Sequence, residues 1–409
     1  MPVSSAVVLV IDRLGAGWLG PYGNTWLDTP HFNRLASHSL LCEAVLAESP
    51  DLATTYRGYW SGLRALQSDS CDTTPLPIAA AAAGARSVLI TDDRGVAQHP
   101  LATSFAECEL LEPSSVGSCS AEIEQTNLFR LFSTASNAVR DLNHPTLLWI
   151  HAAGMSAPWD APLELRNRFA DEDDPLPPAF VDPPNRLLKP GFDPDELLGI
   201  VHAYAGQVAL LDLCLGMLLE ALDEHPLASD TLFVATSPRG YPLGEHLRIG
   251  PCDDALYGEL LHVPLFLRLP ADRREHSRTR QLIQPHELCA AIANVCGWPS
   301  NQSPSGSALL AELRGEPSPP LSAAFATAQH QRAIRTHAWF LRESRHEDRT
   351  RHELFAKPDD RWEANEISSR CTEETELLAS YVDQFEQAVS ANKLAELPPL
   401  ADSLCEMWR

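Results

Sequence analysis

Short runs of apolar residues, each followed by a polar or glycine-containing turn, recur along the chain. Residues 6–11 (AVVLVI) are six consecutive apolar residues, four of them β-branched. This run is too short for a surface helix and is typical of a strand buried on both faces of a parallel sheet. Residues 196–222 show the apolar spacing of a long helix. The pattern predicts an α/β fold with a large central, mostly parallel sheet flanked by helices, with further strands at 87–91, from 145, at 231–235 and at 262–270.

The first apolar run ends at Asp12, and Gly15 and Gly17 follow it in a loop. In open α/β sheets, ligands bind beyond the carboxyl ends of the strands. Asp12 therefore lies where a ligand-facing residue is expected. An aspartate at a strand end can also cap the next turn or helix, and this segment alone leaves both interpretations open.

The excess of acidic over basic residues argues against negatively charged partners. The 409 residues carry 31 basic and 55 acidic side chains, a net charge of −24, which argues against nucleic acid and anionic membranes as partners. No apolar stretch approaches the length needed to span a bilayer, and the N-terminus has no signal-peptide pattern. Ten cysteines without a C-x-x-C pair predict reduced thiols and a cytoplasmic location.

Residues 19–36 combine a G-x-Y-G turn with T-P-x-x-x-R-L-A at the start of a helix. Following a strand that ends in Asp, this order resembles the N-terminus of the sulfatase family, within the alkaline-phosphatase superfamily. The resemblance continues along nearly the whole chain. It implies a sulfatase-like α/β domain at 1–320, with 302–320 as the connecting segment. It also implies a C-terminal subdomain at 321–409, made of a small antiparallel sheet and a packing helix at 377–389.

The resemblance also points to a nucleophile loop. Sulfatases have a C/S-x-P-x-R pattern there, and Arg57 matches its arginine. Counting back four residues places the nucleophile position on Ala53, which has no nucleophilic atom. Thr54 or Thr55 can serve if the register shifts, since phosphate-cleaving relatives use threonine. Alternatively, their hydroxyls only cap the start of a helix.

Other family positions also differ. Asp92-Asp93 stands where the family has a lysine, and the chain has only three lysines, all remote from this position in the sequence. His151 is kept, but Ser156 replaces a histidine; a lone histidine at a strand end is also commonly a hydrogen-bonded structural residue. Where sulfatases have a T-S-D-H-G sequence, this chain has Pro238 and Arg239 in place of the aspartate and the histidine. The L-G-E-H sequence that follows is kept, and it ends at His246.

These differences remove what the family chemistry requires: a nucleophile, several carboxylate ligands for a divalent metal, and a lysine. Among the expected metal ligands only Asp12 is kept, so we expect no metal or other cofactor. The sequence predicts a sulfatase-like protein with a degenerate site and a binding or interaction role. The alternative is a metal-independent sulfate or phosphate ester hydrolase that uses Thr54 or Thr55. No protein partner can be named.

The substitutions also exchange charge signs around one point. Arg13 and Arg239 stand near family metal-binding positions, and Asp92 or Asp93 near the family lysine. We therefore predict that Arg13 or Arg239 pairs with Asp12 or Asp92, with Arg57 nearby. If the arginines outnumber their carboxylate partners, the pocket can hold a small anion such as sulfate.

Overall fold

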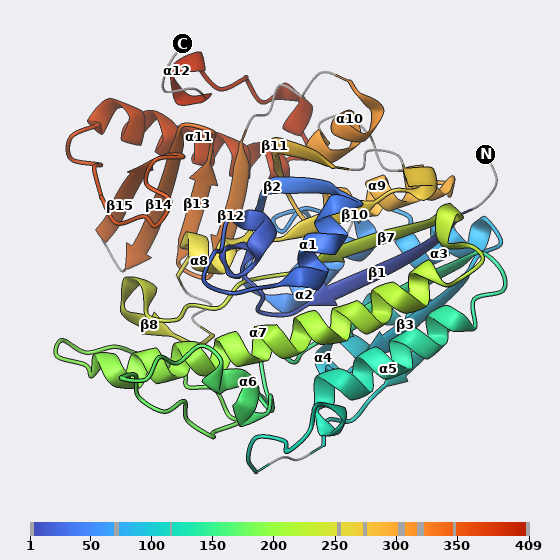
Figure 1. Ribbon diagram of the computed structural model, residues 1–409. Helices are drawn as coiled ribbons and strands as arrows, with labels where there is room; N and C mark the ends of the chain where they lie inside the picture. The colour runs from blue at the N-terminus through green and yellow to red at the C-terminus, as the bar shows by residue number, and fades with distance from the viewer. Residues whose placement is uncertain are drawn as a thin grey trace.

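The computed structural model describes residues 4–68, 73–114, 117–251, 255–272, 276–301, 307–316, 323–346 and 349–405. Its main sheet has the strand order β11-β2-β10-β7-β1-β5-β3-β4, with β9 paired to β2. All pairings are parallel except those made by β9 and β10. The predicted α/β class is confirmed (Figure 1). The strands are β1 (Ser5–Ile11), β2 (Leu40–Leu46), β3 (Arg86–Thr91), β4 (Glu107–Leu110), β5 (Thr146–Ala152), β7 (Thr231–Thr236), β9 (His262–Val263), β10 (Leu265–Arg268) and β11 (Ser277–Ile283).

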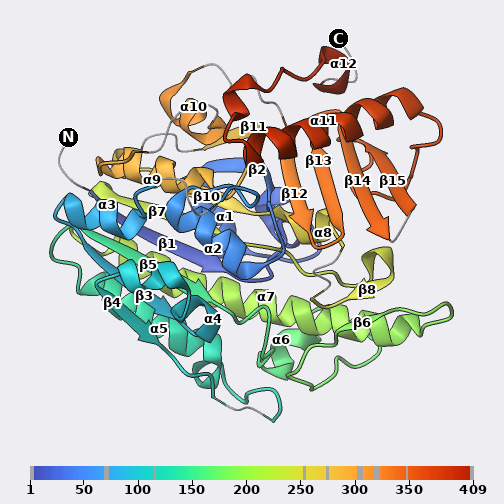
Figure 2. The same ribbon diagram turned by 180° about the vertical axis from the view of Figure 1, so that it is seen from behind.

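Helices cover both faces of this sheet. One face is covered by α1 (Pro30–Ser37), α5 (Asn127–Arg140) and α7 (Pro194–Asp223). The other face is covered by α2 (Leu52–Ser61), α3 (Leu76–Ala82) and α9 (Glu287–Cys296), as the two views show (Figures 1 and 2). The shorter elements are α4 (Arg94–Ala97), α6 (Leu163–Asn167), α8 (Gly258–Leu261) and the ribbon of β6 (Arg186–Leu187) with β8 (Arg248–Ile249).

Strand β1 shows why its sequence is apolar at every position. Val7, Leu9 and Ile11 pack into the core under α5 and α7, whereas Val8 and Val10 pack into the core under α2 and α9. Side chains alternate between the two faces of a strand, so a strand covered on both faces needs apolar residues throughout.

The C-terminal part forms a separate antiparallel sheet, as the sequence predicted. Its order is β12-β13-β14-β15, and α11 (Thr372–Ser390) lies across it (Figure 2). The expected connecting segment contains a helix, α10 (Ala308–Arg314), which packs on the main domain. The predicted boundary at 320/321 lies outside the described residues. The strands are β12 (Ala324–Ala328), β13 (Gln331–Arg335), β14 (Trp339–His346) and β15 (Arg349–Ala356), and α12 (Asp402–Cys405) lies near the C-terminus.

Helix α7 corrects one expectation from the sequence. By length and composition alone it is long and apolar enough to cross a membrane, although no apolar stretch was expected to reach that length. In the fold, 78% of its most apolar window is buried against α5 and the sheet. Core packing on several sides explains why this helix is apolar around most of its circumference.

Candidate functional site

Four strand ends meet at the carboxyl edge of the main sheet. β5 and β7 are the two neighbours of β1, and β3 lies beyond β5. Asp12 follows β1, Asp92 follows β3, and Arg239 lies in the turn after β7. His151 is the penultimate residue of β5 and is in register with Val10 of β1. The parallel topology thus brings these four residues to one region of the fold.

Asp12 and Arg239 form a bidentate ion pair. The guanidinium donates from Nε to Asp12 Oδ1 at 2.9 Å and from Nη2 to Oδ2 at 3.0 Å. The Asp12 side chain is 2% exposed and the Arg239 side chain 11%. Nη1 donates to the carbonyl of Pro50 at 2.7 Å, which ties the pair to the loop before α2. The predicted pairing of Arg239 with Asp12 is confirmed.

The electrostatics of Asp12 follow from this pair. Burial alone would raise the pKa of Asp12, but the charge and hydrogen bonds of Arg239, together with the charge of Arg13, bring the pKa below its ordinary value of 3.8. Asp12 is therefore ionised in the folded protein at neutral pH. The neighbouring Arg13 is 2% exposed and adopts a left-handed conformation (φ 66°), and its carbonyl accepts a hydrogen bond from Tyr204 Oη at 2.7 Å.

The turn that carries Arg239 is held by residues the sequence analysis did not identify. Ser237 is fully buried; its hydroxyl donates to the Arg239 carbonyl at 2.7 Å and accepts from the Leu14 backbone N–H at 3.3 Å. A Cβ atom at Gly240 would lie 2.1 Å from the carbonyl oxygen of Glu259. Only glycine permits this close approach, which fixes the path of the turn beside β1.

His151 is fully buried beneath α2 and bonds to a tyrosine. Its Nδ1 lies 2.6 Å from Tyr56 Oη. Burial is the largest influence on His151 and lowers its pKa, so the ring is neutral at neutral pH. Within the described residues, His151 Nε2 has no hydrogen-bond partner. Tyr56 and Tyr59 were not identified from the sequence, although their spacing places both on one helix face.

Asp92 lies beside the pair without joining it. Its Oδ1 accepts a hydrogen bond from the Ala153 backbone N–H at 2.8 Å. Burial raises the pKa of Asp92 to about 7, and repulsion by Asp93 and Asp12 adds to the shift. Among the described residues, no ion pair joins Asp92 to an arginine. Asp93 caps α4 by accepting from the Val96 backbone N–H at 2.9 Å.

The loop expected to carry the nucleophile leads into α2. Ala53 is exposed in the first turn of that helix. Asp51 is the N-cap: its Oδ2 accepts from the Thr54 backbone N–H at 2.7 Å and from the Thr54 hydroxyl at 2.6 Å. The Thr55 hydroxyl is buried and donates to the carbonyls of Ser49 and Asp51 at 3.2 and 3.1 Å. Both hydroxyls are thus used at the start of the helix.

Arg57 lies one turn further along α2 and faces the loop that follows it. Its guanidinium donates to the carbonyls of Arg64, Ala65 and Gln67 at 2.8–2.9 Å. These bonds fix the loop against α2. The described hydrogen bonds of Arg57 do not connect it to Asp12 or Arg239.

Ser156 and His246 lie in other surroundings. Ser156 is in the turn after β5, where its backbone N–H donates to Ala153 at 2.7 Å. His246 Nδ1 lies 2.9 Å from Glu259 Oε1, and its ring stacks on Tyr257 at 3.6 Å. Burial would lower the pKa of His246, but Glu259 outweighs it and raises the pKa. His246 also contacts the carbonyl of Glu363, so its contacts run towards the C-terminal part.

A cleft of about 310 Å³ opens next to the N-terminus of α2. It lies between the loop before α2 and the turn that joins β12 to β13. The Pro50 carbonyl, which accepts from Arg239, belongs to one of its lining residues. The cleft is lined by Ser49, Pro50, Asp51, Thr54, Ala65, Thr327, Ala328 and Gln329.

Comparisons with known proteins agree with this architecture. The sequence model of the family described as Sulfatase matches residues 4–298. No curated protein sequence matches the chain. The fold is similar to that of the phosphonate monoester hydrolase of Agrobacterium radiobacter, with a TM-score of 0.76, 16% identity and 96% of both chains covered.

Two further solved structures share the fold. One is a protein in complex with its substrate D-glucosamine-2-N,6-O-disulfate, with a TM-score of 0.75, 14% identity, and 98% of this chain and 99% of that chain covered. The other is a 2-O GAG sulfatase, with a TM-score of 0.72, 15% identity, and coverages of 98% and 96%. These likenesses concern the fold. The family match over residues 4–298, together with the sheet order and the site at its carboxyl edge, leads to the conclusion that this chain belongs to the sulfatase family.

Proposed function

We propose that this chain is a non-catalytic member of the sulfatase family that uses the scaffold for binding. The observation that carries the proposal is the bidentate Asp12–Arg239 ion pair at the carboxyl edge of the sheet. Asp12 occupies a position where the family places a metal ligand, and in this chain both of its carboxylate oxygens accept hydrogen bonds from a guanidinium.

The residues around Asp12 do not fit the divalent metal that the family implies. A cation bound to Asp12 would lie against the Arg239 guanidinium, which carries the same sign of charge. Within the described ranges, no group of three or more histidine, cysteine, aspartate or glutamate side chains is arranged to hold a metal ion. Calcium takes six to eight oxygen ligands. The donor set therefore supports a site that works without a metal.

The residues at the expected nucleophile position and the location of Lys357 also favour a binding role. Ala53 lacks a nucleophilic atom, and Thr55 is buried and bonded to two carbonyls. Lys357 pairs with Glu363 at 2.9 Å in the C-terminal part of the chain. Ester hydrolysis needs a nucleophile and groups that stabilise developing negative charge. The groups that the family would use for both are replaced or engaged elsewhere.

A metal-independent hydrolase that uses Thr54 is the second candidate. One observation favours it: the Thr54 hydroxyl lies 2.6 Å from a carboxylate oxygen of Asp51 and opens on the cleft. A carboxylate within hydrogen-bond distance is the geometry of a nucleophile with its base. Asp51 Oδ2, however, also accepts from the Thr54 backbone N–H as the N-cap of α2, so helix capping accounts for the same contact.

The proposal also concerns whether the charged residues at the carboxyl edge of the sheet hold a small anion. A small anion was expected only if arginines outnumber their carboxylate partners. Among the described residues, Arg13 and Arg239 lie in the same region as Asp12, Asp92 and Asp93, so the arginines do not outnumber the carboxylates there. All eight cysteines in the described part of the chain are free thiols, which supports a reducing, cytoplasmic location.

Turnover of aryl sulfate, aryl phosphate and an aryl phosphonate monoester tests the proposal, with the Agrobacterium radiobacter phosphonate monoester hydrolase as the positive control for the phosphonate monoester. We expect the purified chain to release the phenol product no faster than it is released in buffer alone. The matched variant is Thr54→Ala. Turnover that is lost in Thr54→Ala would establish the second candidate. Turnover that survives in that variant would overturn both.

A further inference from the structure

The cleft beside α2 is lined by small and polar residues. Its volume of about 310 Å³ is enough for a small organic molecule. Its polar side chains are three hydroxyls, one amide and one carboxylate, Asp51; the other three lining residues are a proline and two alanines, and no lysine, arginine or histidine is among the eight. A ligand bound there meets a net negative charge.

The donors of Thr54, Arg57 and Arg239, beside the cleft, are directed into the protein. The Thr54 hydroxyl donates to Asp51, and Arg57 donates to three carbonyls of the 64–67 loop. Arg239, behind the cleft, donates to Asp12 and Pro50. Asp51 Oδ1, by contrast, accepts no hydrogen bond within the described residues. The lining hydroxyls and the Gln329 amide can both donate and accept, so Asp51 Oδ1 is the one charged acceptor of this lining that is left open to a donor on a ligand.

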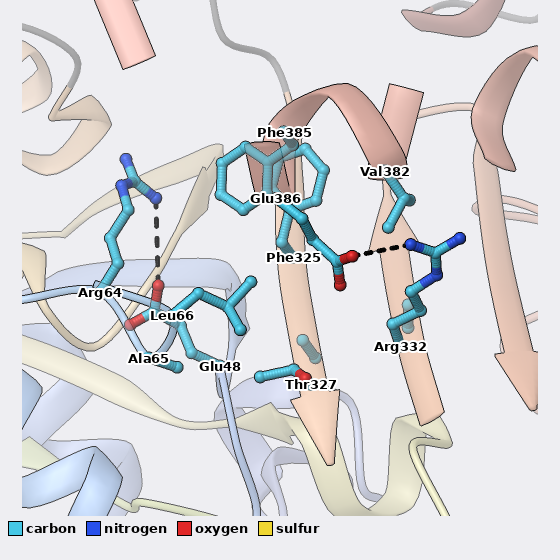
Figure 3. Close-up of a pocket in the computed structure, with 12 residues that line it drawn as sticks. Glu48, Arg64, Ala65, Leu66, Phe325, Thr327, Arg332, Val382, Phe385 and Glu386 are labelled. Carbon is cyan, nitrogen blue, oxygen red and sulfur yellow. Dashed lines mark hydrogen bonds and ion pairs between the residues drawn. The ribbon is translucent and has the colours of Figure 1, made fainter. Parts of the chain in front are cut away.

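The charged residues of the adjoining pocket do not cancel the negative charge of the cleft. A smaller pocket shares Ala65 and Thr327 with the cleft and is lined by two arginines and two glutamates (Figure 3). Arg64 lies 3.9 Å from Glu48, and Arg332 donates to Glu386 at 2.8 Å. Each cation of this wall is compensated by a carboxylate. The N-terminus of α2 favours an anion, but Asp51 already provides one at that position.

We propose that the cleft binds an organic cation, a molecule that carries a primary ammonium or guanidinium group, with Asp51 as its charged partner. An ammonium or guanidinium supplies a positive charge and several donors, which complement the open Asp51 Oδ1 and the oxygens of the neighbouring hydroxyls and amide. The net charge of −24 attracts such a ligand over long distances at low salt. The inference deepens the proposed function, because it names the class of ligand that a non-catalytic site would hold.

Calorimetric titration of the full chain with spermidine and with agmatine tests this proposal, and inorganic sulfate is the anionic comparison. We expect both cations to bind, with affinity that falls as salt rises, and sulfate not to bind at the cleft. Asp51→Asn keeps a good helix N-cap while it removes the charge. It should weaken cation binding about fivefold, the upper effect of an exposed charge pair.

A matched control and a second variant complete the test. Asp193 is the exposed N-cap of α7, so Asp193→Asn makes the same change outside the cleft and should leave cation binding unchanged. Gln329 is exposed on the opposite wall, and Gln329→Glu should strengthen cation binding whereas Gln329→Lys should weaken it. Equal binding by wild type and Asp51→Asn, no cation binding, or sulfate binding that Gln329→Lys strengthens would each overturn the inference. Because binding is measured without turnover, failure here is distinct from failure of the proposed function.

Discussion

The Asp12–Arg239 pair gives a prediction whose size follows from the structure. Replacing Asp12 with Asn removes the carboxylate that pairs with the Arg239 guanidinium, whose side chain is 11% exposed. Breaking a buried ion pair on one side typically costs about 3–5 kcal/mol. Asparagine can still accept one hydrogen bond, and Arg239 keeps its bond to Pro50. We therefore expect Asp12→Asn to lower the free energy of unfolding by about 3 kcal/mol, the lower end of that range.

This loss of unfolding free energy should appear as a shift in the melting temperature. At about 2.1 cal/mol/K per residue, 409 residues give an unfolding entropy of about 0.9 kcal/mol/K. A loss of about 3 kcal/mol then lowers the melting temperature by about 3 °C. Calorimetry and denaturant titration measure this loss. The control is Asp223→Asn, since Asp223 pairs with Arg34 and Arg268 at the surface and should cost less than about 1 kcal/mol.

A double variant and a pH series make the test specific to the pair. Asp12→Asn combined with Arg239→Met should cost less than the sum of the two single changes, because each single change already removes the whole Asp12–Arg239 interaction. The pKa of Asp12 is lowered in the folded protein, so its stabilisation is complete above the unfolded value near 3.8. It is lost as the pH falls through the folded pKa, and the difference between wild type and Asp12→Asn should shrink there. An unchanged melting temperature for Asp12→Asn at neutral pH would refute the reasoning.

Three further outcomes are expected. The pKa of Asp92 is raised to about 7, so wild-type stability relative to Asp92→Asn should fall as the pH rises from about 4 to about 7, and a flat difference in denaturant midpoints would contradict this. Elemental analysis after dialysis should find no stoichiometric calcium, magnesium or zinc, and about one metal ion per chain would contradict the account. Lys357→Met should destabilise the protein by about 3 kcal/mol or more in denaturant titration, because it leaves Glu363 buried without its cation, and a neutral effect would show that the pair is not needed.

The sequence predicted the elements whose pattern has one physical cause. Strands β1, β5 and β7 are covered by helices on both faces, so they appear as continuous apolar runs with polar residues at their ends. The Asp12–Arg239 pair was also predictable, because parallel strands bring their carboxyl ends to one edge and the sequence has an aspartate after one strand and an arginine after its neighbour. Neither inference required knowledge of side-chain packing.

Features that depend on packing between distant segments were not predictable. The bond between Tyr56 and His151 requires the rotation of α2 above the sheet, and the role of Ser237 requires the path of the turn after β7. Helix α10 lies in a segment whose composition indicated only a linker. The choice among Thr54, Thr55 and a capping role also depended on geometry, because Asp51 takes the N-cap and the Thr55 hydroxyl turns towards carbonyls.

We propose that the Asp12–Arg239 pair takes the place of the metal site and that this chain does not hydrolyse sulfate or phosphate esters. The most direct test is aryl sulfate and aryl phosphate turnover by wild type and by the Thr54→Ala, Thr55→Ala double variant, with and without added calcium or magnesium. We predict that both proteins give rates equal to buffer, whether or not metal is present. Wild-type turnover above the rate in buffer alone would contradict the claim, whether the double variant loses or keeps it and whether or not added metal increases it.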